Sequence, residues 1–83
     1  MKTFKITLLP TDETFADNLR ELRSAQCNVR HVNVVRNGLA SECHFVPRTL
    51  PNGWFEYDGY RCEIGEISRV TIYLQTSPKE TYR

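Results

Sequence analysis

The chain has 83 residues, 25% of them charged, and a formal net charge of +1, which fits one small domain. Its 11 basic and 10 acidic residues nearly balance, which argues against a protein built mainly to grip a phosphate backbone. Residues 1–5 lack the apolar core of a signal peptide, and no run reaches the ~18 apolar residues that a membrane span needs, so no membrane association is expected.

The first predicted element is a strand over residues 3–9. Phe4, Ile6 and Leu8 alternate with polar side chains there, which is typical of a strand with one buried face. Pro10 cannot continue a strand ladder and is expected to end it.

A helix is predicted next, with Thr11 or Asp12 as its cap and Asp12 and Glu13 in its first turn, where negative charge suits the helix dipole. Residues 26–28 are expected to close it. Its apolar stripe has helical spacing and comprises Phe15, Ala16, Leu19, Leu22 and Ala25.

Two dipeptides, Asn37-Gly38 and Asp58-Gly59, each stand between runs of strand-forming residues. They are typical of type I′ turns, in which both central residues have positive φ. The sequence therefore predicts two hairpins with two-residue turns. Their strands are expected over residues 29–35 with 39–46, and over residues 54–57 with 60–64.

A two-residue turn also predicts which residues face each other. In the first hairpin Val32 is expected opposite Cys43 on the core face, and His31 opposite His44 on the other face. The same register places Val34 opposite Ser41, Arg30 opposite Phe45, Val35 opposite Ala40, Asn33 opposite Glu42 and Val29 opposite Val46.

In the second hairpin, one face is expected to be core or a binding platform and carries Phe55, Tyr57, Tyr60 and Cys62. The other face is expected to pair Glu56 with Arg61.

The last predicted strand covers residues 69–75, with Val70, Ile72 and Leu74 turned inward, and the residues between 47 and 53 are expected to be a loop. These elements predict an α+β fold. One helix packs on a curved, mostly antiparallel sheet of about five to six strands, in the order β-α-β-β-β-β-β. Residues 1–76 form the single domain, and residues 77–83 are a polar tail.

Cysteine and histidine residues invite a metal interpretation. The set of Cys27, Cys43, Cys62, His31 and His44 lacks the spacing of a zinc motif, however, and an odd number of cysteines suggests free thiols in a reducing cytoplasm. Only the opposed pair His31 and His44 is kept as a weak metal candidate, and no cofactor is predicted.

The residues between 47 and 54 combine two prolines with Arg48, Leu50 and the chain's one tryptophan, Trp54. Trp and Arg are the residue types that dominate binding hot spots. Strand alternation turns Trp54 away from the core face. Because no catalytic motif is present, we expect a non-enzymatic, cytoplasmic domain that binds another protein as an accessory regulator or inhibitor. Small proteins encoded by phages and mobile elements are one expected source of such a domain. Arg48, Leu50, Trp54 and Arg36 are the candidate contacts.

The alternative is a nucleic-acid-binding module. Eight of the 11 basic residues are arginines, and exposed aromatic rings can stack on unpaired bases. The nearly neutral net charge makes this the second choice.

Overall fold

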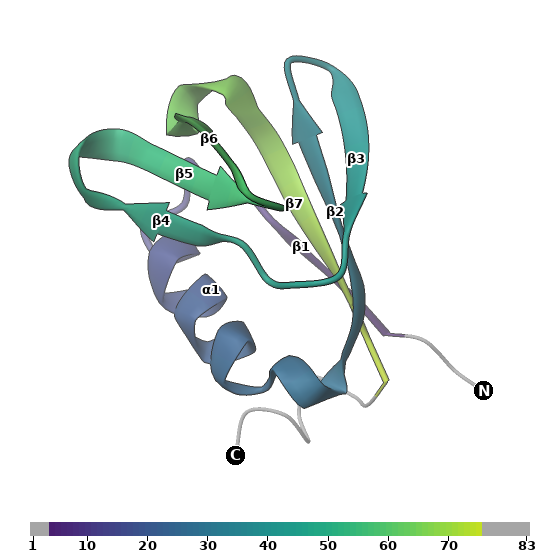
Figure 1. The fold of residues 1–83 in the computed structure, drawn as a ribbon. Coiled ribbons are helices and arrows are strands. Elements are labelled where there is room, and N and C mark those ends of the chain that lie inside the picture. The colour runs from purple at the N-terminus through teal and green to yellow at the C-terminus, as the bar shows by residue number, and fades with distance from the viewer. Residues whose placement is uncertain (1–3, 76–83) are drawn as a thin grey trace.

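The structure is a computed structural model and describes residues 4–75 (Figure 1). This part of the chain holds one α-helix, α1 (Phe15–Ser24). Its seven strands are β1 (Phe4–Leu8), β2 (Val29–Arg36), β3 (Leu39–Cys43), β4 (Arg48–Leu50), β5 (Trp54–Tyr57), β6 (Tyr60–Glu63) and β7 (Ile67–Leu74). Three short 3₁₀ turns complete it: η1 (Gln26–Asn28), η2 (Pro51–Gly53) and η3 (Ile64–Glu66).

The strands form two antiparallel sheets. The larger sheet has the order β1-β7-β2-β3, and the smaller sheet has the order β4-β5-β6. The α+β class is confirmed. The described residues hold seven strands instead of five to six, and these strands are divided between two sheets instead of forming one.

The predicted register is confirmed in the second hairpin and, as far as Cys43, in the first. Val32 lies opposite Cys43, and Phe55 lies opposite Cys62. The reason is the turn geometry: the central residues all have positive φ, at 50° for Asn37, 81° for Gly38, 49° for Asp58 and 81° for Gly59.

The prediction of a loop over residues 47–53 is wrong, because β4 lies within it and pairs with β5. A third hairpin turn makes this possible: Asn52 and Gly53 have φ of 64° and 79°, and Leu50 lies opposite Trp54. Asn52-Gly53 is the same dipeptide that marks the first hairpin, so the signal was present in the sequence.

The helix begins later than predicted. Instead of capping a helix at Thr11 or Asp12, the chain makes a turn, in which the Asp12 carbonyl accepts the Phe15 N–H at 3.1 Å. Thr14 occupies the N-cap position without a side-chain capping bond. The predicted apolar stripe is confirmed at its three buried members, Phe15, Leu19 and Leu22.

One hydrophobic core lies between the larger sheet, the helix and the smaller sheet. Phe15 of α1 stacks on Phe55 of β5 with ring centroids 6.1 Å apart, which joins the helix to the smaller sheet. The larger sheet contributes fully buried side chains from β2 and β7, including the predicted Val70, Ile72 and Leu74. Tyr57 and Cys62 are buried as predicted for one face of the second hairpin, but Tyr60 is 61% exposed.

The predicted pairing of His31 with His44 does not form, because β3 ends at Cys43. The segment that follows β3 is instead hydrogen-bonded to the side chain of Gln26 in η1. The amide nitrogen of Gln26 donates to the His44 carbonyl at 3.0 Å, and its amide oxygen accepts the Val46 N–H at 2.9 Å. The pairs expected beyond Cys43 are lost for the same reason, and Phe45 is 73% exposed.

Within residues 4–75, no helix has both the length and the apolar character that crossing a bilayer requires.

Candidate functional site

The outer face of the smaller sheet presents most of the predicted contact residues. Alternation along β5 buries Phe55 and leaves Trp54 and Glu56 on this outer face. We define the Trp54 surface as the side chains that the register and the shared hollow bring together there: Arg48, Leu50, Pro51, Trp54, Glu56, Arg61 and Glu63.

Trp54 sits beside a shallow hollow of about 370 Å³, which is lined by Leu50, Pro51, Trp54 and Arg61. Leu50 is the cross-strand partner of Trp54 and is half-buried. The indole is 44% exposed, so much of its apolar surface faces solvent. The lining of the hollow therefore combines an indole, two aliphatic side chains and a guanidinium.

Glu56 holds two arginines in place on this surface. Arg48 Nε donates to Glu56 Oε1 at 2.7 Å, and Arg61 Nε donates to Glu56 Oε2 at 3.4 Å. The hydrogen bond from Arg48 lowers the pKa of the Glu56 carboxyl, and Arg61 adds to the effect. Each guanidinium makes this contact through its Nε, which is one of its five N–H donors.

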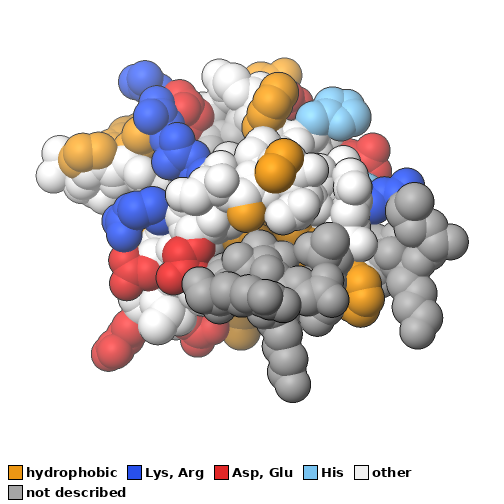
Figure 2. Space-filling view, turned by 90° about the horizontal axis from the view of Figure 1, so that it is seen from below, with side chains coloured by type: hydrophobic (Ala, Val, Ile, Leu, Met, Phe, Trp, Pro, Cys, Tyr) orange, Lys and Arg blue, Asp and Glu red, His pale blue; other side chains and the backbone are white. Residues whose placement is uncertain are grey.

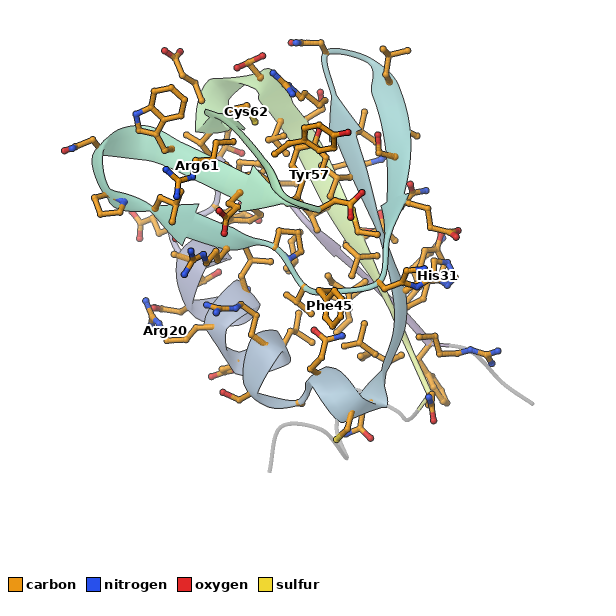
Figure 3. All side chains as sticks on the ribbon, viewed as in Figure 1. Arg20, His31, Phe45, Tyr57, Arg61 and Cys62 are labelled. Atoms are coloured by element: carbon orange, nitrogen blue, oxygen red, sulfur yellow. The ribbon has the colours of Figure 1, made fainter. Side chains whose placement is uncertain are left out.

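Two arginines of the helix lie next to the Trp54 surface. Arg20 and Arg23 of α1 line one small hollow together with Arg48 of β4. Basic side chains gather on one side of the face drawn in Figure 2, with acidic side chains next to them. Arg20 and Arg61 lie on the same side of the molecule (Figure 3), and Arg20 also pairs with Asp17 at 2.8 Å.

Sequence reasoning missed Arg20, Arg23 and Arg61 as site residues. The helical spacing of Arg20 and Arg23 placed them on one face of α1, but nothing local indicated that β4 would lie beside that face. The sequence analysis did not predict β4, which is the strand that lies between the helix and the rest of the Trp54 surface.

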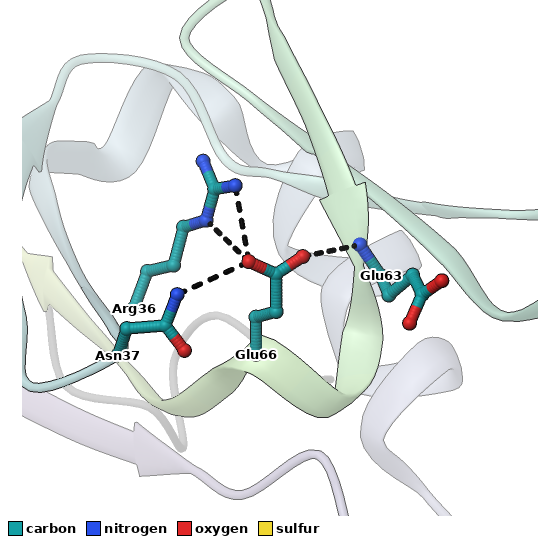
Figure 4. A network of polar contacts seen from close by, with 4 residues as sticks. All are labelled: Arg36, Asn37, Glu63 and Glu66. Carbon is teal, nitrogen blue, oxygen red and sulfur yellow. Dashed lines mark hydrogen bonds and ion pairs between the residues drawn. The ribbon is translucent and has the colours of Figure 1, made fainter.

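Arg36, the fourth predicted contact, lies elsewhere. It belongs to a polar network at the turn of the first hairpin (Figure 4), in which Glu66 Oε1 accepts from Arg36 at 3.1 and 3.2 Å and from Asn37 at 3.1 Å. Glu66 Oε2 accepts the Glu63 backbone N–H at 3.1 Å. A hydrogen bond to Tyr57, followed by the one to Glu66, raises the pKa of Arg36.

This network has a structural role. The backbone bond from Glu63, together with the bonds from Asn37 and Arg36, lowers the pKa of the Glu66 carboxyl. The network thereby connects η3 to the first hairpin. The structure therefore brings Arg48, Leu50 and Trp54 together and leaves Arg36 outside their surface.

His31 and His44, the weak metal candidates, are not cross-strand partners, because β3 ends at Cys43. His31 instead stacks on Tyr73 with ring centroids 4.2 Å apart. Among residues 4–75, no group of three His, Cys, Asp or Glu side chains is arranged to hold a metal ion.

Comparison of the chain with protein-family models, with curated proteins and with solved structures finds no match.

Proposed function

We propose that this protein is a non-enzymatic binding domain, and that it regulates or inhibits another protein by contacting it through the Trp54 surface. The observation that carries the proposal is the exposed indole of Trp54 on the middle strand of the smaller sheet, beside the hollow formed with Leu50 and Pro51. The core already has its own aromatic side chains, so packing alone does not account for this tryptophan.

Preorganisation supports the proposal. Trp54 stands on a central strand of the smaller sheet, and Glu56 holds Arg48 and Arg61 at its side. Side chains that are already ordered lose little conformational entropy on binding. Trp and Arg around a hollow are also the residue types in which hot spots are enriched.

The charge of this region indicates the chemistry of the partner. Four arginines, Arg20, Arg23, Arg48 and Arg61, lie along it. Their ion pairs are with Asp17 and Glu56, and a third carboxylate, that of Glu63, belongs to the cross-strand partner of Trp54. The four arginines outnumber these three carboxylates, and we expect the partner surface to carry acidic side chains around an apolar residue that enters the hollow.

The cysteine chemistry favours a binding role over nucleophilic catalysis. Burial raises the pKa of the Cys43 thiol to about 11 and also raises the pKa of Cys62. Little thiolate is present on either residue at neutral pH, and the thiolate is the nucleophile.

A second candidate is single-stranded nucleic acid. The same four arginines can contact phosphates, and Trp54 can stack on a base. If the ligand is a nucleic acid, its affinity should fall steeply as the salt concentration rises. The affinity for a protein that buries the apolar surface of Trp54 should be less sensitive to salt.

The test starts with capture of partners from a cell lysate on the immobilised protein, with and without nuclease. The affinity for the recovered partner is then measured by calorimetry. We expect Trp54→Ala and Arg48→Ala each to weaken binding by about 2 kcal/mol or more, the magnitude of a hot spot.

The matched control is Tyr60→Ala, because Tyr60 is an exposed aromatic residue of the same sheet outside the Trp54 surface. It should leave the affinity unchanged. Trp54→Ala should change the free energy of unfolding by less than about 1 kcal/mol. Unchanged binding by folded Trp54→Ala and Arg48→Ala would contradict the proposal, and loss of the partner on nuclease treatment would favour nucleic acid.

A further inference from the structure

The four outer strands of the two sheets differ in how well they are protected against pairing with another chain. Natural sheets protect such edges with lysine and other charges, with proline or by keeping the strand short. β1 carries Lys5 and is followed by Pro10. β4 has three residues between Pro47 and Pro51, and β6 alternates Arg61 and Glu63 with its other residues.

The edge strand β3 is the exception. Its sequence is Leu39-Ala40-Ser41-Glu42-Cys43, which contains no lysine, arginine, proline or glycine and one charge. Four of its five residues are exposed, and Leu39 is 74% exposed. β3 lies at an outer side of the fold (Figure 1), and within residues 4–75 only β2 pairs with it.

The hairpin geometry shows which backbone groups of β3 face this free edge. Arg36 and Leu39 flank a two-residue turn and therefore form a hydrogen-bonded pair, and such pairs alternate along an antiparallel ladder. Leu39, Ser41 and Cys43 thus direct their N–H and C=O groups toward β2. Ala40 and Glu42 direct theirs outward.

This outward pattern is self-complementary. When two copies of β3 run antiparallel with Ser41 opposite Ser41 of the second copy, Ala40 faces Glu42 and exchanges both backbone hydrogen bonds with it. The twofold symmetry repeats the pair on the other side. No two like charges are opposed, the small side chains of Ala40 and Ser41 fill the centre, and Leu39 faces Cys43 of the second copy.

We propose that β3 is a self-association edge, and that two copies of this chain pair through it in this register, joining the two larger sheets into one continuous sheet. The surface is distinct from the Trp54 surface, so the dimer does not depend on the proposed partner. A single strand pair buries a small area, so the association is weak and reversible.

Charge at position 40 tests the register. Ala40→Lys sets an ammonium opposite each Glu42 carboxylate, and Ala40→Glu sets a carboxylate there. Both replace the same exposed residue. In sedimentation equilibrium over a concentration series, we expect Ala40→Glu to lower the association constant by about tenfold, because it creates two like-charge pairs, and Ala40→Lys to raise it.

A cross-link tests the same register independently, in a Cys27→Ser background that removes the exposed native thiol. Ser41 pairs with its own copy at a non-hydrogen-bonded position, where Cα atoms lie about 4.5 Å apart, within the range of a disulfide. Mild oxidation should convert Ser41→Cys to a covalent dimer. Glu42→Cys is the matched control, because it faces Ala40, and should cross-link far more slowly.

Trp54→Ala should leave the self-association constant unchanged. The proposal of a β3 dimer and the proposal of partner binding through the Trp54 surface can therefore fail independently of each other. A protein that stays monomeric at every concentration and does not cross-link through Ser41→Cys would overturn the proposal. Equal association of Ala40→Lys and Ala40→Glu, or equal cross-linking at positions 41 and 42, would overturn the register.

Discussion

At the scale of single residues, Glu66 has the largest set of polar contacts described in this chain. Its carboxylate accepts hydrogen bonds from Arg36, from Asn37 and from the Glu63 backbone. All of these contacts favour the ionised form, which is why the pKa of Glu66 is lowered. One side chain thereby joins the first hairpin to the start of β7.

This arrangement predicts part of the acid sensitivity of the protein. A carboxyl group whose pKa is lowered by folding adds stability above its unfolded pKa, about 4.3 for Glu, and this stability is lost as the pH falls through the folded pKa. We expect Glu66→Gln to lower the free energy of unfolding at pH 7 and to make it less dependent on pH below about 4.

Urea titrations at pH 7 and in the acid range check this expectation. Glu21→Gln is the control, because Glu21 is an exposed carboxylate on α1. Equal pH dependence of unfolding in wild type and Glu66→Gln would show that the network contributes no stability.

At the scale of elements, the β4–β5 hairpin decides whether the Trp54 surface exists. Its turn requires Asn52 and Gly53 in the left-handed region, with Gly53 at φ 79°. Non-glycine residues are disfavoured there by roughly 1–2 kcal/mol. The turn sets Leu50 opposite Trp54 and Arg48 opposite Glu56.

Gly53→Ala is therefore expected to lower the free energy of unfolding by about 1 kcal/mol and to loosen the Trp54 surface. Gly65→Ala is the matched control: both sites have free space for a Cβ, but the φ of Gly65 is not in the left-handed region, so this variant should be neutral or slightly stabilising. Chemical denaturation followed by Trp54 fluorescence measures both effects. Equal stability of the two variants would argue against a strained turn at Gly53.

At the scale of the whole molecule, the two sheets share one core, although within residues 4–75 no strand of one sheet pairs with a strand of the other. Cys43 of the larger sheet and Cys62 of the smaller sheet are both buried in the same cluster of apolar side chains, whereas Cys27 is exposed. A shared core of this kind is expected to unfold as one cooperative unit.

Thiol labelling can test this cooperativity. In native conditions we expect Cys27 to react rapidly. Cys43 and Cys62 should react slowly and with one common rate, after correction for their rates in the unfolded chain, because both need the same opening of the core. Mass spectrometry of a Cys27→Ser variant measures the two buried sites. Much faster labelling of Cys62 would show that the smaller sheet opens by itself.

Local patterns in the sequence were sufficient to predict much of the fold and part of the site. The turns at Asn37-Gly38 and Asp58-Gly59 determined two registers, because a two-residue turn leaves no freedom in the pairing of its strands. Alternation likewise determined that Trp54 faces outward from the core. These features depend on residues that are neighbours along the chain.

Only the tertiary structure decided where β3 ends, because the hydrogen bonds of Gln26 to residues 44 and 46 link segments that are far apart in sequence. It also decided that Arg20 and Arg23 lie beside Arg48, and that Arg36 is committed to Glu66. Periodicity shows which face a side chain takes on its own element. Which element comes to lie next to that face depends on how the whole core packs, and this choice is not encoded in any local run of residues.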